Sequence, residues 1–258
     1  MFSNNIHLLQ KLVVLFLFAL ILQNCDDANS LLNPSWKNSG VVLTFDDTSV
    51  GEWIQADSLL SNYDWKATFC VGPITKFHDD DYANLLALQN KGHEIAAHGL
   101  NHLNAVEYID EHSIQEYLDA EILPELDILD QKGLKVNAFA YPQGTRNAMT
   151  DSVLFNYFDI LRGTTYSKKA PEQHHCYYVD KPLVYGLGID ANYGNDTNYI
   201  IELLRYAEQN DKYLILYCHK PVEVDTVIYT TSMYKLEAIC SFVKANGMRF
   251  KTLSELGK

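Results

Sequence analysis

Two neighbouring carboxylates and a pair of histidines are the residues of this sequence that could carry out chemistry together. Asp46 and Asp47 directly follow the apolar, β-branched run Val41–Phe45, and His98 and His102 come later in the chain. Such a run predicts a buried strand that delivers both acids at its end. Adjacent charges there are costly unless a cation compensates them. We therefore expect a divalent cation bound by Asp47, with Asp46 free for proton transfer.

The two histidines supply the remaining ligands of the expected metal site. His98 and His102 are four residues apart, so in a helical turn both imidazoles would face the same side. Three protein ligands leave an open position at which a metal can activate water and polarise a carbonyl. Asp46 would then be the base. His219 ends the predicted strand Tyr213–Tyr217 and is the candidate general acid.

From Ser35 onward, short apolar strands alternate with longer amphipathic segments, which is typical of an α/β fold. Seven or eight such units predict a parallel (β/α) barrel in a single catalytic domain, with the chemistry where strands end. The predicted strands are Val41–Phe45, Ala67–Val71, Glu94–Ala97, Val136–Ala140, Asp159–Gly163, Leu183–Tyr185, Tyr213–Tyr217 and Arg249–Lys251. The clearest helices are Tyr82–Lys91, Ile114–Leu129, Asn198–Gln209 and Met233–Ala245, and Ser113 and Glu116 form a capping-box pattern before the second of these.

Composition narrows the class of protein. The chain has 258 residues and a formal net charge of -13, and 47% of its residues are hydrophobic. This length and composition allow one sizeable core. Without a basic stripe, nucleic acid is excluded as an expected partner, because polyanion binding depends on clustered Lys and Arg.

The N-terminus predicts export. Lys11 precedes the apolar run Leu12–Leu22, which is too short to span a bilayer and typical of a signal-peptide core. The residues before Cys25 resemble a bacterial lipoprotein cleavage site, so we expect lipidation of Cys25, with ordinary cleavage after Ser30 as the alternative. The predicted division is a signal peptide over residues 1–24, a linker over 25–35 and a catalytic domain over 36–258.

Export places the protein in the bacterial cell envelope, lipid-anchored or periplasmic, or outside the cell. A membrane is expected as a partner only through the lipid anchor.

The other cysteines are not expected to be lipidated. Cys70, Cys218 and Cys240 fall in or beside predicted strands or a helix, like small buried hydrophobes. Cys176 follows two histidines, and we expect a solvated loop there because no matching ligand pair is apparent.

Four segments resemble, in order, the first, second, third and fifth motifs of the polysaccharide deacetylases of carbohydrate esterase family 4, the NodB-homology domain. These segments are Thr44–Asp47, His98–His102, Phe139–Gly144 and Leu216–His219. The resemblance extends from about Val41 to the C-terminus. It implies a distorted (β/α)7–8 barrel, a metal held by Asp47, His98 and His102, and Asp46 as base with His219 as acid. It also implies that the backbone N–H of Gln143, after Pro142, helps to hold the oxyanion.

The chain departs from the family at two places. Ala140 stands where an Arg that tunes the base is common, and Gln143 replaces an aromatic groove residue. Arg162, at the end of the next predicted strand, is a candidate to return a guanidinium to the base. Asp190 is a candidate for part of the fourth motif's role. For Tyr141 and Pro142, a rigid turn and a place in the cleft wall are both open.

The predicted activity is metal-dependent removal of acetyl groups from a polysaccharide or oligosaccharide, chiefly the N-acetyl groups of amino sugars. Zinc is the expected metal, with cobalt, nickel or manganese as alternatives. One rival is an O-acetyl xylan esterase, and another is a carbohydrate-binding relative with weakened catalysis. An iron oxygenase shares the two-His-one-carboxylate ligands but leaves Asp46 and His219 unexplained. The oligomeric state is not predicted.

Overall fold

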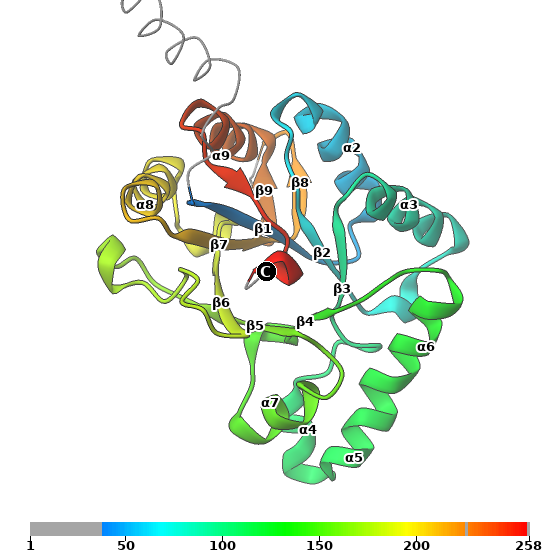
Figure 1. Cartoon of the computed structure of the whole chain (residues 1–258). Coiled ribbons are helices and arrows are strands. Elements are labelled where there is room, and N and C mark those ends of the chain that lie inside the picture. Colours follow the sequence, from blue (N-terminus) through cyan, green and yellow to red (C-terminus); the bar gives the residue numbers. More distant parts are fainter. Residues whose placement is uncertain (1–37, 225–226, 257–258) are drawn as a thin grey trace, which may run out of the picture. The chain divides into compact units, whose positions relative to one another are not determined.

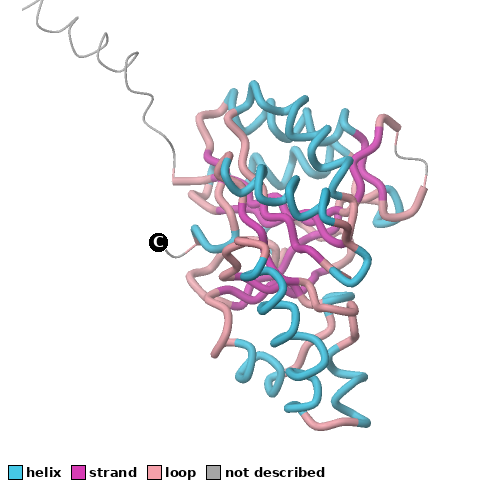
Figure 2. The backbone as a smooth tube through the Cα atoms, turned by 90° about the vertical axis from the view of Figure 1, so that its right-hand side faces the viewer, coloured by secondary structure: helices cyan, strands magenta, loops and turns pink. Residues whose placement is uncertain are grey.

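Seven parallel strands form a closed barrel in the computed structural model of the protein, which describes residues 38–224 and 227–256 (Figure 1). Strands β1 to β7 pair in sequence order, and β7 pairs with β1 to close the ring. Helices pack on the outside of the strands (Figure 2). The predicted (β/α) barrel is thereby confirmed. The expected signal peptide, Cys25 and linker lie outside the described residues.

Each predicted strand is present, with ends that differ by up to three residues. Two further short strands, β8 and β9, pair with each other after β7 and were not predicted. The strands are β1 Gly40–Asp47, β2 Thr68–Val71, β3 Glu94–Ala97, β4 Ala138–Ala140, β5 Ile160–Thr165, β6 Leu183–Gly188, β7 Tyr213–Cys218, β8 Lys220–Val222, β9 Thr230–Ser232 and β10 Arg249–Phe250.

The four predicted helices are also present, together with three that the periodicity did not single out. The capping box of Ser113 and Glu116 is confirmed, and the long helix that it opens contains a π-helical turn, Leu118–Ile122, between α5 and α6. The α-helices of the described residues are α2 Val50–Leu60, α3 Asp79–Asn90, α4 Ala105–Glu111, α5 Ile114–Tyr117, α6 Leu123–Gln131, α7 Ala148–Leu154, α8 Thr197–Gln209 and α9 Met233–Ala245.

The barrel is distorted because its strand pairs differ in length. Strand β1 pairs with β7 over six residues, whereas β3 and β4 share only the pair Ala97 and Phe139. At its start β1 also pairs with β10, and β2 joins β1 only from Thr44 onward. All of these pairs are parallel, so the strand ends that carry Asp46 and Asp47 point to the same rim as the end of β3.

The C-terminal segment closes the opposite mouth of the barrel. Leu253 and Leu256 pack in the cluster of buried residues inside the barrel, and Figure 1 shows the red turn Leu253–Glu255 in front of the middle of the barrel. Glu94, the first residue of β3, accepts hydrogen bonds from Thr68 Oγ1 at 2.9 Å and from the Ser254 backbone N–H at 3.1 Å. These contacts fix the segment against the starts of β2 and β3.

The prediction of a solvated loop at Cys176 is wrong. Cys176 and His174 are buried, and the Cys176 carbonyl accepts a 2.7 Å hydrogen bond from the Ile215 N–H. Tyr177 forms an antiparallel bridge to Leu214 in β7. The segment therefore packs along a barrel strand, and its backbone pairing outweighs the polarity of the two adjacent histidines.

All four cysteines in the described ranges, Cys70, Cys176, Cys218 and Cys240, are free and buried. Within 38–224 and 227–256, no helix is long and apolar enough to cross a membrane.

We expect Leu253→Ala to lower the free energy of unfolding by about 2–5 kcal/mol, because it opens a cavity where the C-terminal segment fills the barrel. Leu253 is 0% exposed. Leu59→Ala is the matched control, since Leu59 is 63% exposed. Urea unfolding followed by circular dichroism measures both. Equal stability of the two variants would contradict the closing function of the segment.

Candidate active site

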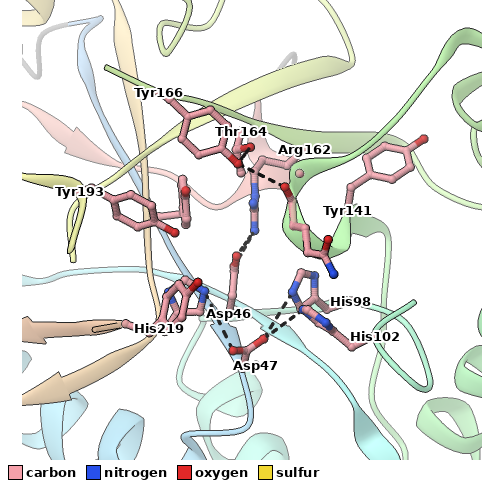
Figure 3. Close-up of a pocket in the computed structure, with 14 residues that line it drawn as sticks. Asp46, Asp47, His98, His102, Tyr141, Arg162, Thr164, Tyr166, Tyr193 and His219 are labelled. Carbon is pink, nitrogen blue, oxygen red and sulfur yellow. Dashed lines mark hydrogen bonds and ion pairs between the residues drawn. The ribbon is translucent and has the colours of Figure 1, made fainter. Parts of the chain in front are cut away.

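The candidate residues meet in one cavity of about 480 Å³ at the carboxyl ends of the barrel strands. Figure 3 shows Asp47 between His219 on one side and His98 and His102 on the other, with Arg162 pointing at Asp46. Pro142 and Asp190 are not among the lining residues. The predicted residues that line the cavity are Asp46, Asp47, His98, His102, Tyr141, Gln143, Arg162 and His219.

Strand β1 brings two consecutive carboxylates into the same cavity. Neighbouring residues of an extended strand point to opposite faces, which would separate the two side chains. Asp47 has φ 80°, so the extended conformation ends there, and the Asp47 carbonyl accepts a hydrogen bond from the Gly72 N–H at 3.2 Å. Asp46 is 3% exposed, whereas the Asp47 side chain is 38% exposed. The two acids therefore occupy different environments.

Asp47, His98 and His102 form a set of side chains that could hold a metal ion. Their potential ligand atoms all lie within 4.8 Å of one another. Nε2 of His98 is 3.6 Å and Nε2 of His102 is 3.4 Å from Asp47 Oδ1. His98 Nδ1 donates to the Ala140 carbonyl at 2.7 Å, so its Nε2 lone pair faces Asp47. One carboxylate and two imidazoles suit a divalent transition metal.

The expectation that a helical turn aligns the two histidines is wrong. His98 follows β3 directly, and the segment up to Asn104 is a loop. Gly99 and His102 have φ 90° and 63°, values that an α-helix excludes. The two imidazole centroids still lie 4.8 Å apart. The two imidazoles are therefore brought together by a loop with two left-handed residues, and not by a helical turn.

The pKa shifts of Asp47 and His102 favour metal binding. Burial acts to raise the pKa of Asp47, but the contact with His98 and the nearby charges of the histidines outweigh it and lower that pKa. Burial, with His98 adding to it, lowers the pKa of His102. A carboxylate anion facing a neutral imidazole is the form that binds a cation.

Asp46 forms a buried ion pair with Arg162. Arg162 Nη2 lies 2.5 Å and 2.6 Å from the two carboxylate oxygens, and the Arg162 side chain is 0% exposed. Burial opposes the charge of Arg162, but Asp46 more than compensates and raises the pKa of the guanidinium. In the sheet register Arg162 lies directly opposite Ala140. The guanidinium thus reaches the acid from the strand next to the position where an Arg was expected.

His219 is oriented by a second buried carboxylate. Its Nδ1 donates to Asp190 Oδ2 at 2.6 Å, which leaves Nε2 facing the cavity, 4.0 Å from Asp47 Oδ2. Asp190 also accepts from Thr231 Oγ1 at 2.6 Å and from the His219 N–H at 3.2 Å. Burial acts to lower the pKa of His219, but the bond to Asp190 and the surrounding carboxylates raise it. The sequence reasoning missed Thr231, which lies in the unpredicted β9.

The turn after β4 shapes the other side of the cavity. Gln143 has φ 58° and ψ 5°, its side-chain oxygen accepts from Asn104 Nδ2 at 3.1 Å, and its carbonyl accepts from Tyr166 Oη at 3.2 Å. Tyr141 lines the cavity and donates through Oη to Asp151 at 2.9 Å. Pro142 is buried and begins the tight turn. Tyr141 is thus a cleft residue and Pro142 a turn residue.

Sequence reasoning missed several residues of the cavity wall. They come from loops that follow β5, β6 and β8, and from β5 and β7 themselves. Aromatic content alone did not indicate which tyrosines line the cavity. These residues are Thr164, Tyr166, Tyr193, Tyr217 and Tyr229.

One family model matches part of the chain. The family model described as "Polysaccharide deacetylase" matches residues 35–157. This confirms the resemblance to the polysaccharide deacetylases. The matched range includes Asp46, Asp47, His98 and His102, but it ends before Arg162.

Solved structures with the same fold support the barrel assignment. A carbohydrate esterase family 4 enzyme from Streptococcus mutans has 17% identity, covering 83% of this chain and 86% of that one, with TM-score 0.57. Peptidoglycan deacetylase PdaC from Bacillus subtilis has 18% identity, covering 87% and 91%, with TM-score 0.54. A family 4 carbohydrate esterase from Streptomyces lividans has 17% identity, covering 84% and 93%, with TM-score 0.53. No curated protein sequence matches the chain.

The ion pair generates a stability prediction. Arg162→Met should lower the free energy of unfolding by about 3–5 kcal/mol, because it leaves the Asp46 carboxylate buried without a partner. Adding Asp46→Asn to this variant should restore part of the loss. Urea unfolding in the presence of a chelator measures both, with Arg205→Met as the exposed control. A loss of less than about 1 kcal/mol, as for a surface pair, would contradict the assignment.

Proposed function

We propose that the protein is a metal-dependent hydrolase that removes acetyl groups from a polysaccharide, chiefly the N-acetyl groups of amino sugars. The observation that supports this proposal best is the division of the two carboxylates at the end of β1. Asp46 is paired with Arg162, while Asp47 faces His98 and His102. One acid is thus available for proton transfer and the other for a cation.

Asp47, His98 and His102 would hold the metal, with zinc proposed first and cobalt, nickel or manganese as alternatives. A divalent cation bound there would supply Lewis acidity toward the acetyl carbonyl and toward water. The cavity beside these residues leaves room for the acetyl group.

Proton transfer is assigned to two side chains near Asp47, Asp46 and His219. Asp46 accepts the proton of the attacking water, and Arg162 holds the Asp46 carboxylate in place. His219 donates its Nε2 proton to the leaving amine nitrogen as the C–N bond breaks. Asp190, bonded to His219 Nδ1, fixes the imidazole orientation and stabilises its protonated form.

The oxyanion is assigned to the turn after β4. The left-handed conformation of Gln143 places this residue in the cavity wall, and its backbone N–H is the proposed donor to the developing negative charge. Gly144 is required for the same turn, because a Cβ there would overlap Thr164 and its φ is 71°. The turn geometry, rather than the Gln side chain, therefore carries this function.

Tyrosines in the cavity wall suit a carbohydrate. Tyr166 and Tyr229 are 50% and 49% exposed and line the cavity, and Tyr193 and Tyr217 lie deeper. Exposed aromatic faces provide apolar contact for sugar rings. The similar Bacillus subtilis structure is a peptidoglycan deacetylase, which favours an N-acetylated substrate here. Removal of O-acetyl groups from xylan would use the same residues.

The proposed location is the bacterial cell envelope or the exterior, reached through the signal peptide of residues 1–24. Lipidation of Cys25 would anchor the protein to a membrane, and cleavage after Ser30 would release it. An acetylated cell-wall or environmental glycan would be accessible in either case.

The two rival functions are less well supported. A carbohydrate-binding relative without efficient catalysis was considered because Ala140 replaces an Arg, but Arg162 brings a guanidinium to Asp46. An iron oxygenase would leave two side-chain pairs, Asp46 with Arg162 and Asp190 with His219, without a use.

Acetate release is the direct test of the proposed activity. We expect zinc-loaded protein to release acetate from chitooligosaccharides, peptidoglycan or poly-N-acetylglucosamine faster than from acetylxylan. Removal of the metal with a chelator should abolish release, and added zinc should restore it. Activity that survives complete chelation would contradict the mechanism. If no acetylated glycan releases acetate with zinc or cobalt, while Asp46→Asn still binds glycan like the parent protein, the binding alternative holds.

Substitution of the two neighbouring acids should separate their functions. Asp46→Asn should lower kcat by about 10²–10⁴-fold, because it removes the base, and should leave zinc affinity close to that of the parent protein, because Asp47, His98 and His102 are unchanged. Asp47→Asn should weaken zinc binding. Steady-state acetate assays and zinc competition with a chromogenic chelator measure both effects, with the exposed Asp80→Asn as control. Equal loss of zinc affinity in both Asn variants would argue against the division.

A further inference from the structure

Two glutamates of the helical segment 114–131 hold the backbone of the loop that carries His98 and His102. Glu125 accepts from the N–H groups of His98 and Gly99, at 3.0 Å through each carboxylate oxygen. Glu121 accepts from the N–H groups of Asn101 at 2.7 Å and Leu103 at 2.8 Å. The Glu121 backbone carbonyl also accepts from the Leu100 N–H at 3.1 Å. Five loop amides are thus bonded to two helix residues.

Both glutamates are completely buried, which is costly for carboxylates. Glu121 and Glu125 are each 0% exposed. Burial raises the pKa of Glu125 well above its usual range and that of Glu121 less strongly, against the opposing effect of the loop N–H groups. Since all four carboxylate oxygens accept hydrogen bonds, the geometry suits the ionised forms. Such groups persist in a protein interior only when they satisfy other buried polar groups.

The loop needs these acceptors because its conformation is irregular. The left-handed Gly99 and His102 prevent the amides between them from pairing as a helix or a strand. The space is also tight: a Cβ on Gly99 would lie 3.1 Å from Glu121 Oε2. Changing the glutamates therefore changes the backbone from which both imidazoles project.

The helix supplies the two carboxylates from consecutive turns. Glu121 lies in the π-helical turn Leu118–Ile122, and Glu125 lies in α6, four residues later. This spacing puts both side chains on the face toward the loop. Figure 1 shows α5 and α6 as one continuous helical segment outside the barrel. The loop is thus braced from a rigid element rather than from another loop.

We propose that Glu121 and Glu125 are positioning residues that preset the His98–Leu103 loop for metal binding. The two imidazoles already face Asp47 because the glutamates fix the loop backbone, so little ordering is left for the metal to impose. This inference rests on the proposed metal-dependent function. It means that Glu121 and Glu125, which are buried outside the cavity, affect metal affinity through the loop backbone.

The test compares three hydrogen-bonded glutamates, of which Glu121 and Glu125 are buried and Glu94 is half-buried. Glu125→Gln and Glu121→Gln each keep the side-chain volume but replace one acceptor oxygen by a donor amide that faces a loop N–H. Glu94→Gln is the matched control, because Glu94 is also a hydrogen-bonded glutamate, half-buried, but lies at the start of β3, at the other end of the strand that His98 follows. Zinc affinity is measured by competition with a chromogenic chelator, and the cobalt-loaded visible spectrum reports ligand geometry. Urea unfolding of the metal-free proteins reports stability.

We expect the two loop-facing variants to lose about 10–100-fold in zinc affinity and to alter the cobalt spectrum. Glu94→Gln should lose stability but keep zinc affinity within about twofold of the parent protein, because it does not contact the loop. If Glu125→Gln does not fold, Glu121→Gln carries the comparison, since it affects only the Asn101 and Leu103 amides.

Two results would overturn the positioning assignment: parent-like zinc affinity in the folded loop-facing variants, or an equal loss of affinity in Glu94→Gln. The second result would mean that affinity follows general stability. Parent protein that binds neither zinc nor cobalt would instead contradict the proposed function itself, so the two failures are distinguishable.

Discussion

The arrangement of the candidate site depends on the buried ion pair between Asp46 and Arg162. A carboxylate that is 3% exposed at a strand end is tolerable only with a compensating charge, and Arg162 supplies it at 2.5 Å. The pair links β1 to β5 across the barrel interior, so it requires both strands in register. Once Asp46 is neutralised by Arg162, the adjacent Asp47 is free to face the histidines.

The same principle recurs at the other functional side chains. His219 is held by the buried Asp190, and the loop of His98 is held by the buried Glu125. In each case a charge from another element, inaccessible to solvent, orients a group that faces the cavity. Hydrogen bonds to charged groups are stronger than neutral ones and fix geometry more closely. The site is therefore rigid because of charges outside it, and not only because the barrel is well packed.

Sequence patterns predicted the features that depend on local periodicity and on motif spacing. The barrel strands and the cavity residues Asp46, Asp47 and His219 followed from short apolar runs and the polar residues at their ends. The patterns did not predict left-handed residues such as His102, because non-glycine residues adopt this conformation only when tertiary contacts impose it. Buried Cys176 was misassigned for a related reason, since its pairing with β7 is far away in sequence.

The position of Arg162 in the sequence and its place in the sheet each explain part of its pairing with Asp46. Its sequence position at a strand end made it a candidate partner for Asp46, but only the sheet register explains why it can replace an Arg at position 140. Ala140 and Arg162 are directly paired neighbours on β4 and β5, and the guanidinium that reaches Asp46 comes from β5. A small residue at 140 then leaves space in the interior for the long side chain from β5. The small Ala140 and the long Arg162 therefore fit together: the space that an Arg at position 140 would need is available to the side chain from β5.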